Sequence, residues 1–269
     1  MKILITGATG FIGTHVAKHL APDHEIITWS RCEGSLDNLP ADIECVVHLA
    51  GAAGGNLETC ISSNVVPTAE VLRAMEHARI PRIVFLSGAA VYQDSSEILG
   101  ENAPLGSTAP YGISKIAAES LIKKWHELGY IKTAIILRGN NIYGLGSDHG
   151  VISGFLAQAK NGAITVDGDG SQVREPVYVD DAVSIIQKSI EVTREGVRIY
   201  NVSGPRAYTL RDIATEIGLA LGKEISFHLS GKLAAPPLAL RLSISKAKEE
   251  LGWTPHSDLG GGLAKIQRA

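Results

Sequence analysis

The amino-acid sequence predicts an α/β fold, a doubly wound parallel sheet with a smaller C-terminal α/β lobe. Short apolar runs typical of buried strands alternate with segments of helical spacing in the first half of the chain. A glycine-rich turn joins the first of these strands to the first helix. After about residue 141 the strands become shorter, and glycine and aspartate cluster between them. The first two observations predict the sheet, and the third predicts the separate lobe.

The predicted elements of the sheet follow one another in a regular order. Apolar runs predict buried strands at 2–6, 25–29, 45–50, 83–87 and 133–138. Helical spacing predicts helices at 11–20, 64–78 and 110–128, and Gly129 ends the last of them. Strands of this kind, separated by helices, are expected to pair in parallel and to be covered on both faces. Ligands of such sheets bind beyond the carboxyl ends of the strands.

The rest of the chain mixes short strands with helices. Strands are expected at 199–202 and 225–228, and helices at 180–190 and 210–221. We therefore expect a first domain over residues 1–141 and a smaller lobe over 142–269. The segment 176–203 is able to pack back onto the first domain.

Composition and charge exclude several classes of protein. Hydrophobic residues make up 45% of the chain and charged residues 20%, which is ordinary for a globular protein, and a net charge of −3 offers no general basic surface for nucleic acid. Cys32, Cys45 and Cys60 form no metal-binding spacing, so no metal is expected, and an odd number of cysteines fits a reducing cytoplasm. No signal segment and no transmembrane run are apparent.

The glycine turn at 7–13 has the spacing of a dinucleotide-binding fingerprint. Gly7 permits the tight turn, Gly10 allows the backbone to approach a pyrophosphate, and Gly13 allows close packing of helix on strand. The N-terminus of the following helix offers free N–H groups and a positive dipole to phosphates. Cofactor contacts are expected from Gly7, Thr9, Gly10, Phe11, Ile12 and Gly13. The turn therefore predicts a Rossmann-type nucleotide site.

The end of the second strand bears on the choice between NAD and NADP. NAD-binding proteins often carry an acidic residue there, which bonds the ribose 2′-hydroxyl. Here Ser30 and Arg31 follow the strand, and Arg31 is able to pair with a 2′-phosphate. Asp37 is a further candidate, as an acceptor for the adenine amino group. The sequence therefore favours NADP over NAD.

A Tyr/Lys pair lies about a hundred residues after the glycine turn. The four-residue offset places Tyr111 and Lys115 one turn apart on the same face of a helix. Free tyrosine has a pKa of about 10, and a nearby ammonium favours the phenolate, so we expect Lys115 to lower the pKa of Tyr111. Tyr111 is then a candidate acid/base for a carbonyl/alcohol pair, while hydride moves to or from nicotinamide.

With these motifs in place, nearly the whole chain resembles the extended short-chain dehydrogenase/reductase family, the NAD(P)-dependent nucleotide-sugar epimerases and dehydratases. The matching segments are TGATGFIG (6–13), HLAG (48–51), Asn64 with its helix, VFLSGAAVY (84–92), PYGISK (110–115), LRGNNIYG (137–144), GDGSQVREPVYVDD (168–181), YNVSG (200–204) and SKAKEELGW (245–253). Several of these segments are typical of the extended branch rather than of nucleotide-binding proteins in general.

The resemblance implies roles for residues outside the fingerprint. It places Leu49, Ala50 and Gly51 along the cofactor groove. It also implies that Asn140 contacts the cofactor and Asn141 the substrate.

A further implied role concerns the substrate. Arg174 matches a position that pairs with a substrate diphosphate in nucleotide-sugar enzymes, and the chemistry of its guanidinium suits this role. The alternative is an interlobe salt bridge to a nearby acid.

The chain departs from the family pattern in one part of the catalytic set. Relatives usually carry Ser or Thr three residues before the Val of the Val-Tyr pair, and Gly88 stands there. Ser87 is the candidate replacement, both as catalytic hydroxyl donor and as substrate contact. Loss of one hydrogen bond to a developing oxyanion costs a factor of about 10²–10³ in rate.

A second departure lies before the segment 245–253. Relatives usually carry a second arginine there, for which this chain offers Lys232, Leu233 and Pro236 by spacing, with Arg241 nearer to Ser245. A second contact to a diphosphate is therefore not expected.

Together, these features predict a NAD(P)-dependent epimerase or ketoreductase acting on a sugar-like, nucleotide-linked alcohol or ketone; the sequence does not separate these two activities. The alternative is an NADP-binding redox sensor or scaffold with little catalysis. No nucleic acid or membrane partner is expected. The resemblance implies a homodimer that pairs through the helices at 64–78 and 111–128.

Overall fold

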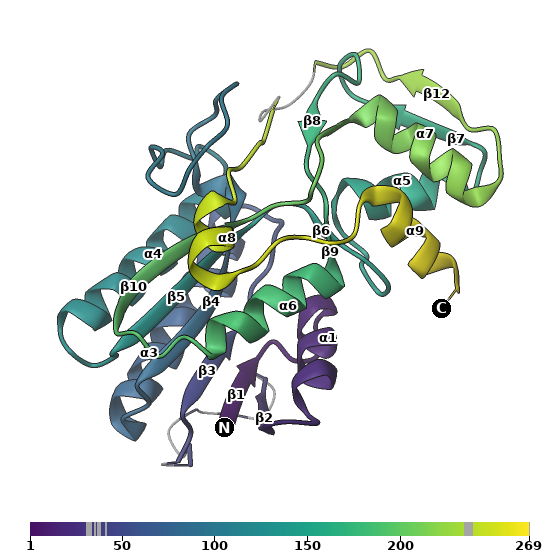
Figure 1. Cartoon of the computed structure of the whole chain (residues 1–269). Helices are drawn as coiled ribbons and strands as arrows, with labels where there is room; N and C mark the ends of the chain where they lie inside the picture. The colour runs from purple at the N-terminus through teal and green to yellow at the C-terminus, as the bar shows by residue number, and fades with distance from the viewer. Residues whose placement is uncertain (31–33, 35, 37–38, 41, 234–238, 269) are drawn as a thin grey trace. The chain divides into compact units, whose positions relative to one another are not determined.

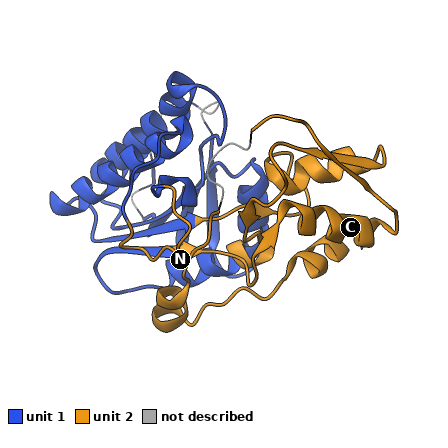
Figure 2. Ribbon diagram, turned by 90° about the horizontal axis from the view of Figure 1, so that it is seen from above, with its two compact units in different colours: residues 1–93, 104–138, 183–200 blue, residues 94–103, 139–182, 201–269 orange. Residues whose placement is uncertain are grey.

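The computed structural model describes residues 1–30, 34, 36, 39–40, 42–233 and 239–268 (Figure 1). The chain divides into two compact units (Figure 2). Unit 1 comprises residues 1–93, 104–138 and 183–200, and unit 2 comprises residues 94–103, 139–182 and 201–269. The division therefore lies near the expected boundary at 141–142. The chain passes between the two units more than once, however, because segment 94–103 belongs to unit 2 and segment 183–200 belongs to unit 1.

Unit 1 is built on a six-stranded sheet with the strand order β10-β5-β4-β3-β1-β2. The strands are β1 (Lys2–Thr6), β2 (Glu25–Trp29), β3 (Cys45–His48), β4 (Arg82–Gly88), β5 (Thr133–Gly139) and β10 (Gly196–Val202). Parallel pairing joins β2, β1, β3 and β4, so their carboxyl ends lie along one edge of the sheet. The predicted α/β class is confirmed.

Helices cover both faces of this sheet (Figure 1). The long ones are α1 (Phe11–Leu20), α3 (Val66–Ala78), α4 (Pro110–Glu127) and α6 (Val179–Ile190), whose first residues are assigned to unit 2. Unit 1 also contains α2 (Leu57–Cys60), the π-helical turn η2 (Ile61–Val65) and the short 3₁₀ turn η3 (Ala89–Val91). Apolar residues of α3 and α4, such as Leu72, Met75 and Ile122, pack with Val46 and Phe85 of the sheet. Burying these side chains is the main stabilisation of the layer, at about 1.5–3 kcal/mol for each large residue.

One strand from the later part of the chain joins the main sheet. The run 199–202 lies in the segment 176–203, which was expected to be able to pack back onto the first domain, and it forms part of the edge strand β10. The reason is apolar packing, because Val197 and Ile199 lie against the core of unit 1. The start of β10 is also bonded to the residue before β5, with Gly196 N donating to Lys132 O at 2.8 Å.

Unit 2 consists of short two-stranded pairs and helices. Its strands are β6 (Ile142–Tyr143), β7 (Ala163–Val166), β8 (Val173–Arg174), β9 (Val177–Tyr178), β11 (Tyr208–Thr209) and β12 (Ser226–Leu229). Its helices are α5 (Gly150–Ala159), α7 (Leu210–Leu221), α8 (Ser245–Leu251) and α9 (Leu259–Arg268). The strands pair as β11 with β8, β12 with β7 and β6 with β9.

Membrane-spanning helices and clusters of metal-binding side chains are both absent from the part of the chain that the structure describes. Within it, no helix has both the length and the apolar character needed to cross a membrane. The same residues form no group of three or more His, Cys, Asp or Glu side chains that could hold a metal ion.

Candidate active site

The glycine turn between β1 and α1 has a backbone that larger residues do not fit. Gly7 has φ +73°, and a Cβ there would lie 2.7 Å from the backbone nitrogen of Ala50. A Cβ on Gly13 would collide with the carbonyl oxygen of Gly7. The N–H of Gly10 donates to Gly7 O at 3.0 Å, which closes the turn. The turn is therefore built from close backbone contacts that require glycine.

The start of α1 is free to receive an anion. Gly10 precedes the helix without a side-chain cap, and the first turn carries no acidic residue. Thr9 and Gly10 are exposed, while Phe11 and Ile12 are half-buried. Uncapped N–H groups and a helix dipole are suited to a pyrophosphate. The residues present therefore fit the dinucleotide that the sequence predicts.

The loop after β3 brings the glycine turn and the Tyr/Lys helix together. Leu49 N donates to the carbonyl of the last residue of β1 at 3.1 Å, which ties the loop to the sheet. At Gly51 a Cβ would lie 3.4 Å from Lys115 Nζ and would collide with Asn64 Oδ1. Leu49, Ala50 and Gly51 thus lie between the glycine turn and Lys115.

Lys115 is buried and held in a defined position. The residue is 5% exposed, and Nζ donates to Leu86 O at 2.9 Å. The ammonium also lies 4.6 Å from the centroid of the Phe85 ring and 5.9 Å from that of Tyr111. Burial lowers the pKa of Lys115 to about 8. The lysine is therefore a positioned cation that titrates near physiological pH.

Tyr111 behaves differently from the sequence expectation. Lys115 was expected to lower the pKa of Tyr111, but burial raises it to about 12. The physical reason is that loss of water disfavours the phenolate. Burial therefore favours the phenol form of Tyr111 in this structure.

Gly88 and Ser87 occupy different surroundings at the end of β4. A Cβ on Gly88 would lie 2.8 Å from the hydroxyl oxygen of Tyr111. The Ser87 side chain is buried, and its hydroxyl donates to Glu119 Oε1 at 2.7 Å. The structure therefore corrects the expectation that Ser87 replaces the missing hydroxyl. The Ser87 hydroxyl proton is already bonded to a buried carboxylate, and Gly88 is the residue that faces Tyr111.

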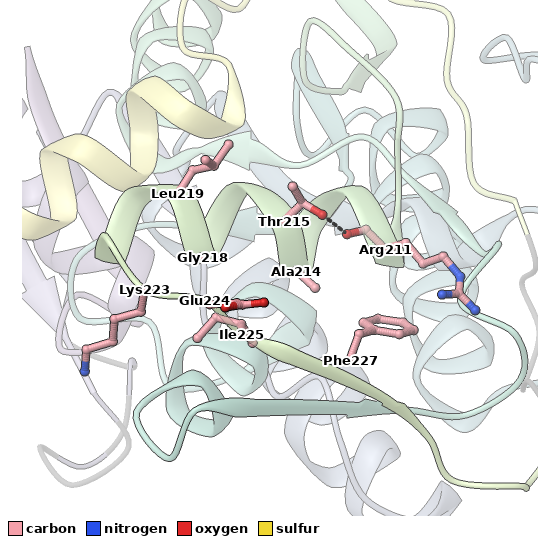
Figure 3. Close-up of a pocket in the computed structure, with 9 residues that line it drawn as sticks. All are labelled: Arg211, Ala214, Thr215, Gly218, Leu219, Lys223, Glu224, Ile225 and Phe227. Atoms are coloured by element: carbon pink, nitrogen blue, oxygen red, sulfur yellow. Dashed lines mark hydrogen bonds between the residues drawn. The ribbon is translucent and has the colours of Figure 1, made fainter.

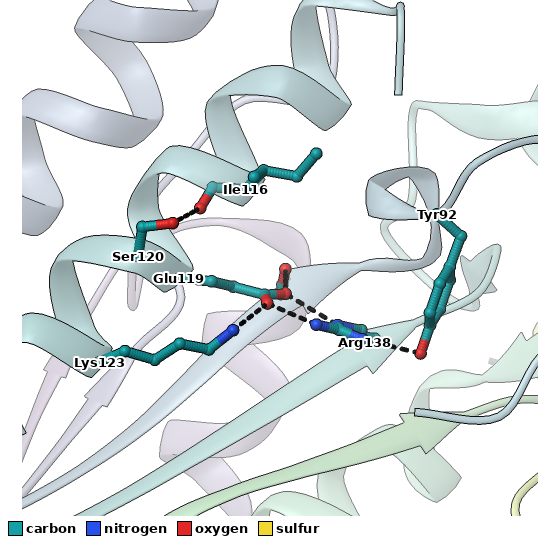
Figure 4. Close-up of polar contacts among 7 residues, drawn as sticks. Tyr92, Ile116, Glu119, Ser120, Lys123 and Arg138 are labelled. Carbon is teal, nitrogen blue, oxygen red and sulfur yellow. Dashed lines mark hydrogen bonds and ion pairs between the residues drawn. The ribbon is translucent and has the colours of Figure 1, made fainter. Parts of the chain in front are cut away.

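A buried ion pair underlies this part of the site (Figure 4). Glu119 of α4 receives two bonds from Arg138 of β5, from Nε to Oε1 at 3.0 Å and from Nη2 to Oε2 at 2.7 Å. Arg138 Nη1 also donates to the hydroxyl of Tyr92 at 3.0 Å, and Lys123 Nζ lies 3.7 Å from Glu119. The sequence interpretation missed this network. The signal for it is a charged residue inside the apolar run 133–138, which requires a buried partner.

The two predicted asparagines lie in unit 2. The side chain of Asn140 is hydrogen-bonded to other groups of the protein. It is completely buried, and Nδ2 donates to Ser203 Oγ at 3.2 Å and to Leu240 O at 3.0 Å. Its Oδ1 accepts from Asn141 Nδ2 at 2.6 Å. Asn141 itself has φ +45°, a strained value for a residue other than glycine. Asn140 therefore has no side-chain N–H left to donate to a cofactor.

Arg174, in β8 of unit 2, is a half-buried guanidinium. It donates from Nη1 to Val173 O at 2.8 Å. Among the described residues no carboxylate comes within ion-pair distance of Arg174, although Asp94 acts on it from farther away. Burial lowers its pKa. A partly desolvated cation that lacks an ion-pair partner within the described chain is suited to binding an anion.

The other residues weighed near the substrate position are engaged or outside the described chain. Arg241 Nε lies 3.8 Å from Glu175 Oε1, so this arginine pairs within unit 2. Lys232 is exposed, and Leu233 is 95% exposed. Pro236 lies outside the described residues.

At the second strand, Ser30 follows β2 and is half-buried. Arg31 and Asp37 lie outside the described residues. The described chain therefore does not test the predicted contacts to the adenosine ribose.

A pocket in unit 2 includes none of the predicted site residues in its lining (Figure 3). It is lined by Arg211, Ala214, Thr215, Gly218, Leu219, Lys223, Glu224, Ile225 and Phe227. Arg211 lies 4.6 Å over the Phe227 ring, so its cation is already occupied by an aromatic face. None of the catalytic or binding residues described above lines this pocket.

The parts of unit 1 define a class of protein. A strand, a glycine turn and an uncapped helix form a backbone turn suited to a dinucleotide, and the loop beside it passes close to the lysine of a Tyr/Lys pair. This is the arrangement of a nicotinamide-dependent short-chain dehydrogenase-type enzyme.

Comparison with known proteins identifies the family. The model of the "NAD dependent epimerase/dehydratase family" matches residues 3–203. The chain belongs to this family and is an enzyme of the extended short-chain dehydrogenase/reductase type, so the resemblance inferred from its motifs is confirmed.

Curated relatives cover nearly the whole chain. A putative UDP-glucose 4-epimerase of Methanocaldococcus jannaschii is 31% identical over 98% of this chain and 96% of its own length. UDP-glucuronic acid decarboxylase 6 of Arabidopsis thaliana is 29% identical over 99% of this chain and 88% of its own length.

Solved structures support the fold. UDP-glucuronic acid 4-epimerase from Bacillus cereus, in complex with UDP-glucuronic acid and NAD, gives a TM-score of 0.90 at 24% identity, covering 100% of this chain and 99% of that one. UDP-glucose 4-epimerase from Thermotoga maritima, with UDP-glucose, gives 0.87 at 23% identity, covering 100% and 98%.

Proposed function

We propose that this enzyme epimerises a carbon of a nucleoside-diphosphate sugar, with a nicotinamide dinucleotide held at the glycine turn. The observation that carries the proposal is the buried Tyr111/Lys115 pair, joined to the cofactor cradle through Gly51. The names of the relatives, UDP-glucose 4-epimerase among them, support a UDP-sugar and the 4-position.

The side chains divide the chemistry between them. Lys115, held by Leu86 O and the Phe85 ring, places positive charge next to the loop that lines the cofactor groove. Tyr111, as the phenolate, accepts the proton of the sugar hydroxyl when the sugar is oxidised to a ketone, and returns that proton to the oxygen when the ketone is reduced. When bound, the nicotinamide supplies the hydride carrier. Gly88 supplies no second hydroxyl, so Tyr111 carries the proton transfer without one from that position.

The test combines cofactor retention with product analysis. The purified enzyme is examined for nicotinamide absorbance and fluorescence, then incubated with UDP-glucose and with UDP-glucuronic acid, and the sugars are separated by chromatography. We expect conversion to the 4-epimer without net consumption of cofactor. Stoichiometric oxidation of NADPH by a keto-sugar, with no epimer formed, would instead establish a reductase.

Arg174 is proposed to bind the diphosphate of this substrate. We expect Arg174→Met to raise KM for the UDP-sugar about 10–100-fold, because a charge-assisted hydrogen bond contributes about 1.5–3 kcal/mol. The inhibition constant of free UDP should rise in parallel. Arg211→Met is the matched control, since Arg211 lies over the Phe227 ring in the same unit. Unchanged KM and UDP inhibition in the Arg174 variant would contradict the assignment.

The preference for NADP is proposed from the residues after β2. Ser30 places no carboxylate at the end of that strand, and Arg31 is available to a 2′-phosphate. We expect NADP to bind more tightly than NAD to protein stripped of cofactor, and Arg31→Ala to lower NADP affinity about tenfold while leaving NAD affinity unchanged. Equal loss for both cofactors, measured by calorimetry, would contradict a contact to the 2′-phosphate.

A homodimer through the helices of unit 1 is proposed from exposed apolar side chains. Leu57, Ile61, Val66 and Ile113 are 39–45% exposed on α2, η2, α3 and α4. We expect Ile61→Lys combined with Ile113→Glu to give a monomer in light scattering coupled to size exclusion. Leu219→Lys, at a 72% exposed leucine of unit 2, is the control that should keep the wild-type mass. A wild-type monomer would contradict the proposal.

A further inference from the structure

A short turn at the end of β4 lies directly against the first turn of α4. It comprises Gly88 and the 3₁₀ segment η3, residues 88–91 in all. A Cβ on Gly88 would lie 2.8 Å from the hydroxyl oxygen of Tyr111 and 3.0 Å from Cε1 of its ring. On the helix side, a Cβ on Gly112 would collide with the carbonyl oxygen of Ala90. Since neither glycine carries a side chain, the position of the 88–91 turn sets the space that is left for the Tyr111 hydroxyl.

The residue before the 88–91 turn is bonded to a buried carboxylate. Ser87 is 3% exposed, and its hydroxyl donates to Glu119 Oε1 at 2.7 Å. Glu119 is 0% exposed and follows Tyr111 by about two turns of α4. A hydroxyl bond to an ionised carboxylate is stronger than a bond between neutral groups, so it fixes the end of β4 against the helix.

The residue after the 88–91 turn is bonded to the partner of the same carboxylate. Tyr92 is 4% exposed, and its hydroxyl accepts from Arg138 Nη1 at 3.0 Å (Figure 4). The guanidinium carbon also lies 4.8 Å from the centroid of the Tyr92 ring. Arg138 forms two further bonds to Glu119. Both ends of the turn are therefore attached to one ion pair, which joins α4 to β5.

The ion pair supplies directed bonds that apolar packing would not. Replacing a buried ion pair by apolar residues of similar volume often costs no stability, so stability alone does not explain why charges stand here. Glu119 Oε1 accepts from Arg138 Nε at 3.0 Å and also from the Ser87 hydroxyl. Because these bonds share one oxygen, the position of Ser87 is linked to that of Arg138.

We propose that Glu119 and Arg138 are positioning residues, which hold both ends of the 88–91 turn and thereby keep Gly88 at its contact with the Tyr111 hydroxyl. The catalytic consequence rests on the proposed role of Tyr111, whereas the attachment of the turn to the ion pair does not. This role is separate from the contribution of the pair to stability, because the two bonds to the turn can be removed while the ion pair stays intact.

Two mild substitutions release the turn without breaking the ion pair. Ser87→Ala removes the bond to Glu119, and Tyr92→Phe removes the bond from Arg138 but keeps the ring against the guanidinium. In the double variant we expect amides at 88–93 to exchange about tenfold faster, measured by hydrogen exchange with mass spectrometry. kcat for the UDP-sugar should fall about 10–100-fold while KM stays within about twofold, since displacement of a reacting group by about 1 Å costs up to 10²-fold.

The matched control is Ser189→Ala combined with Tyr130→Phe, which removes the same two kinds of hydroxyl elsewhere in unit 1. Ser189 donates a buried bond to Ile185 O in α6, and Tyr130 is 42% exposed. This control should keep the wild-type kcat and the wild-type exchange at 88–93. Wild-type kcat in the double variant, or unchanged exchange at 88–93, would overturn the proposal.

Gly88→Ala tests the contact with Tyr111 and leaves both hydroxyl bonds of the turn in place. The added Cβ would lie 2.8 Å from the Tyr111 hydroxyl oxygen, so that oxygen must move. We expect kcat to fall about tenfold with KM nearly unchanged. Gly154→Ala is the control, because a Cβ at this exposed position of α5 would meet nothing within 4 Å. Wild-type kcat in Gly88→Ala would overturn the catalytic consequence. Full activity of Tyr111→Phe would overturn the proposed function instead, and the exchange at 88–93 would still decide whether the ion pair holds the turn.

Discussion

Tyr111→Phe is expected to slow turnover of the UDP-sugar by about 10²–10⁴-fold, the contribution typical of a positioned acid/base. The variant keeps the ring beside Gly88 and removes only the hydroxyl. No hydrogen bond involves that hydroxyl within the described part of the chain, so the free energy of unfolding should change little. The retained Lys115 and glycine turn should preserve cofactor binding.

The measurement is single-turnover epimerisation, followed together with cofactor fluorescence. Tyr130→Phe is the matched control, since Tyr130 is 42% exposed on the same unit and contacts the Trp125 ring. Loss of turnover with retained cofactor supports the acid/base role. Wild-type turnover in Tyr111→Phe would contradict that role. If the wild-type enzyme also turns over no substrate and Tyr111→Phe has no effect in cells, the redox-sensor alternative becomes the better interpretation.

Glu119→Gln is expected to lower the free energy of unfolding by about 3–5 kcal/mol, because it leaves the buried guanidinium of Arg138 without a compensating charge. The two side chains are 0% and 2% exposed in their ion pair. Ser87 and Lys123 lose a charged neighbour in the same change. Urea denaturation, followed by the fluorescence of the tryptophans, measures the effect.

Two controls separate charge burial from general damage. Glu127→Gln breaks the exposed pair with Lys124 on the same helix, and should cost about 0–1 kcal/mol. Glu119→Leu combined with Arg138→Met removes both charges, and should recover much of the stability lost in Glu119→Gln. A single variant within 1 kcal/mol of wild type would contradict the view that this pair needs its charge balance.

Local patterns allowed much of unit 1 to be predicted. The helix at 11–20 and the strand at 25–29 have the expected bounds, because apolar periodicity and glycine positions act within a few residues. The glycine spacing also predicted the backbone contacts of Gly7 and Gly13. Long-range partners were harder: β10 belongs to the main sheet because Val197 and Ile199 pack on its core.

The candidate site shows the same division. The offset of Tyr111 and Lys115 followed from helical geometry, yet the opposite pKa shift of Tyr111 depends on burial that no local motif records. Likewise, Ser87 and Gly88 are neighbours in sequence, but only the position of Glu119 decides that the serine hydroxyl is already occupied.

By itself, the sequence determined the α/β class, the nucleotide turn, the Tyr/Lys pair and the family, because each depends on spacing along one strand, turn or helix. Only the tertiary structure decided which polar groups are satisfied internally and which remain for a ligand. In that structure, the side chains of Asn140 and Ser87 donate hydrogen bonds to other groups of the protein, whereas Arg174 has no ion pair among the described residues. The physical reason is that hydrogen bonds and desolvation depend on partners brought together from distant parts of the chain.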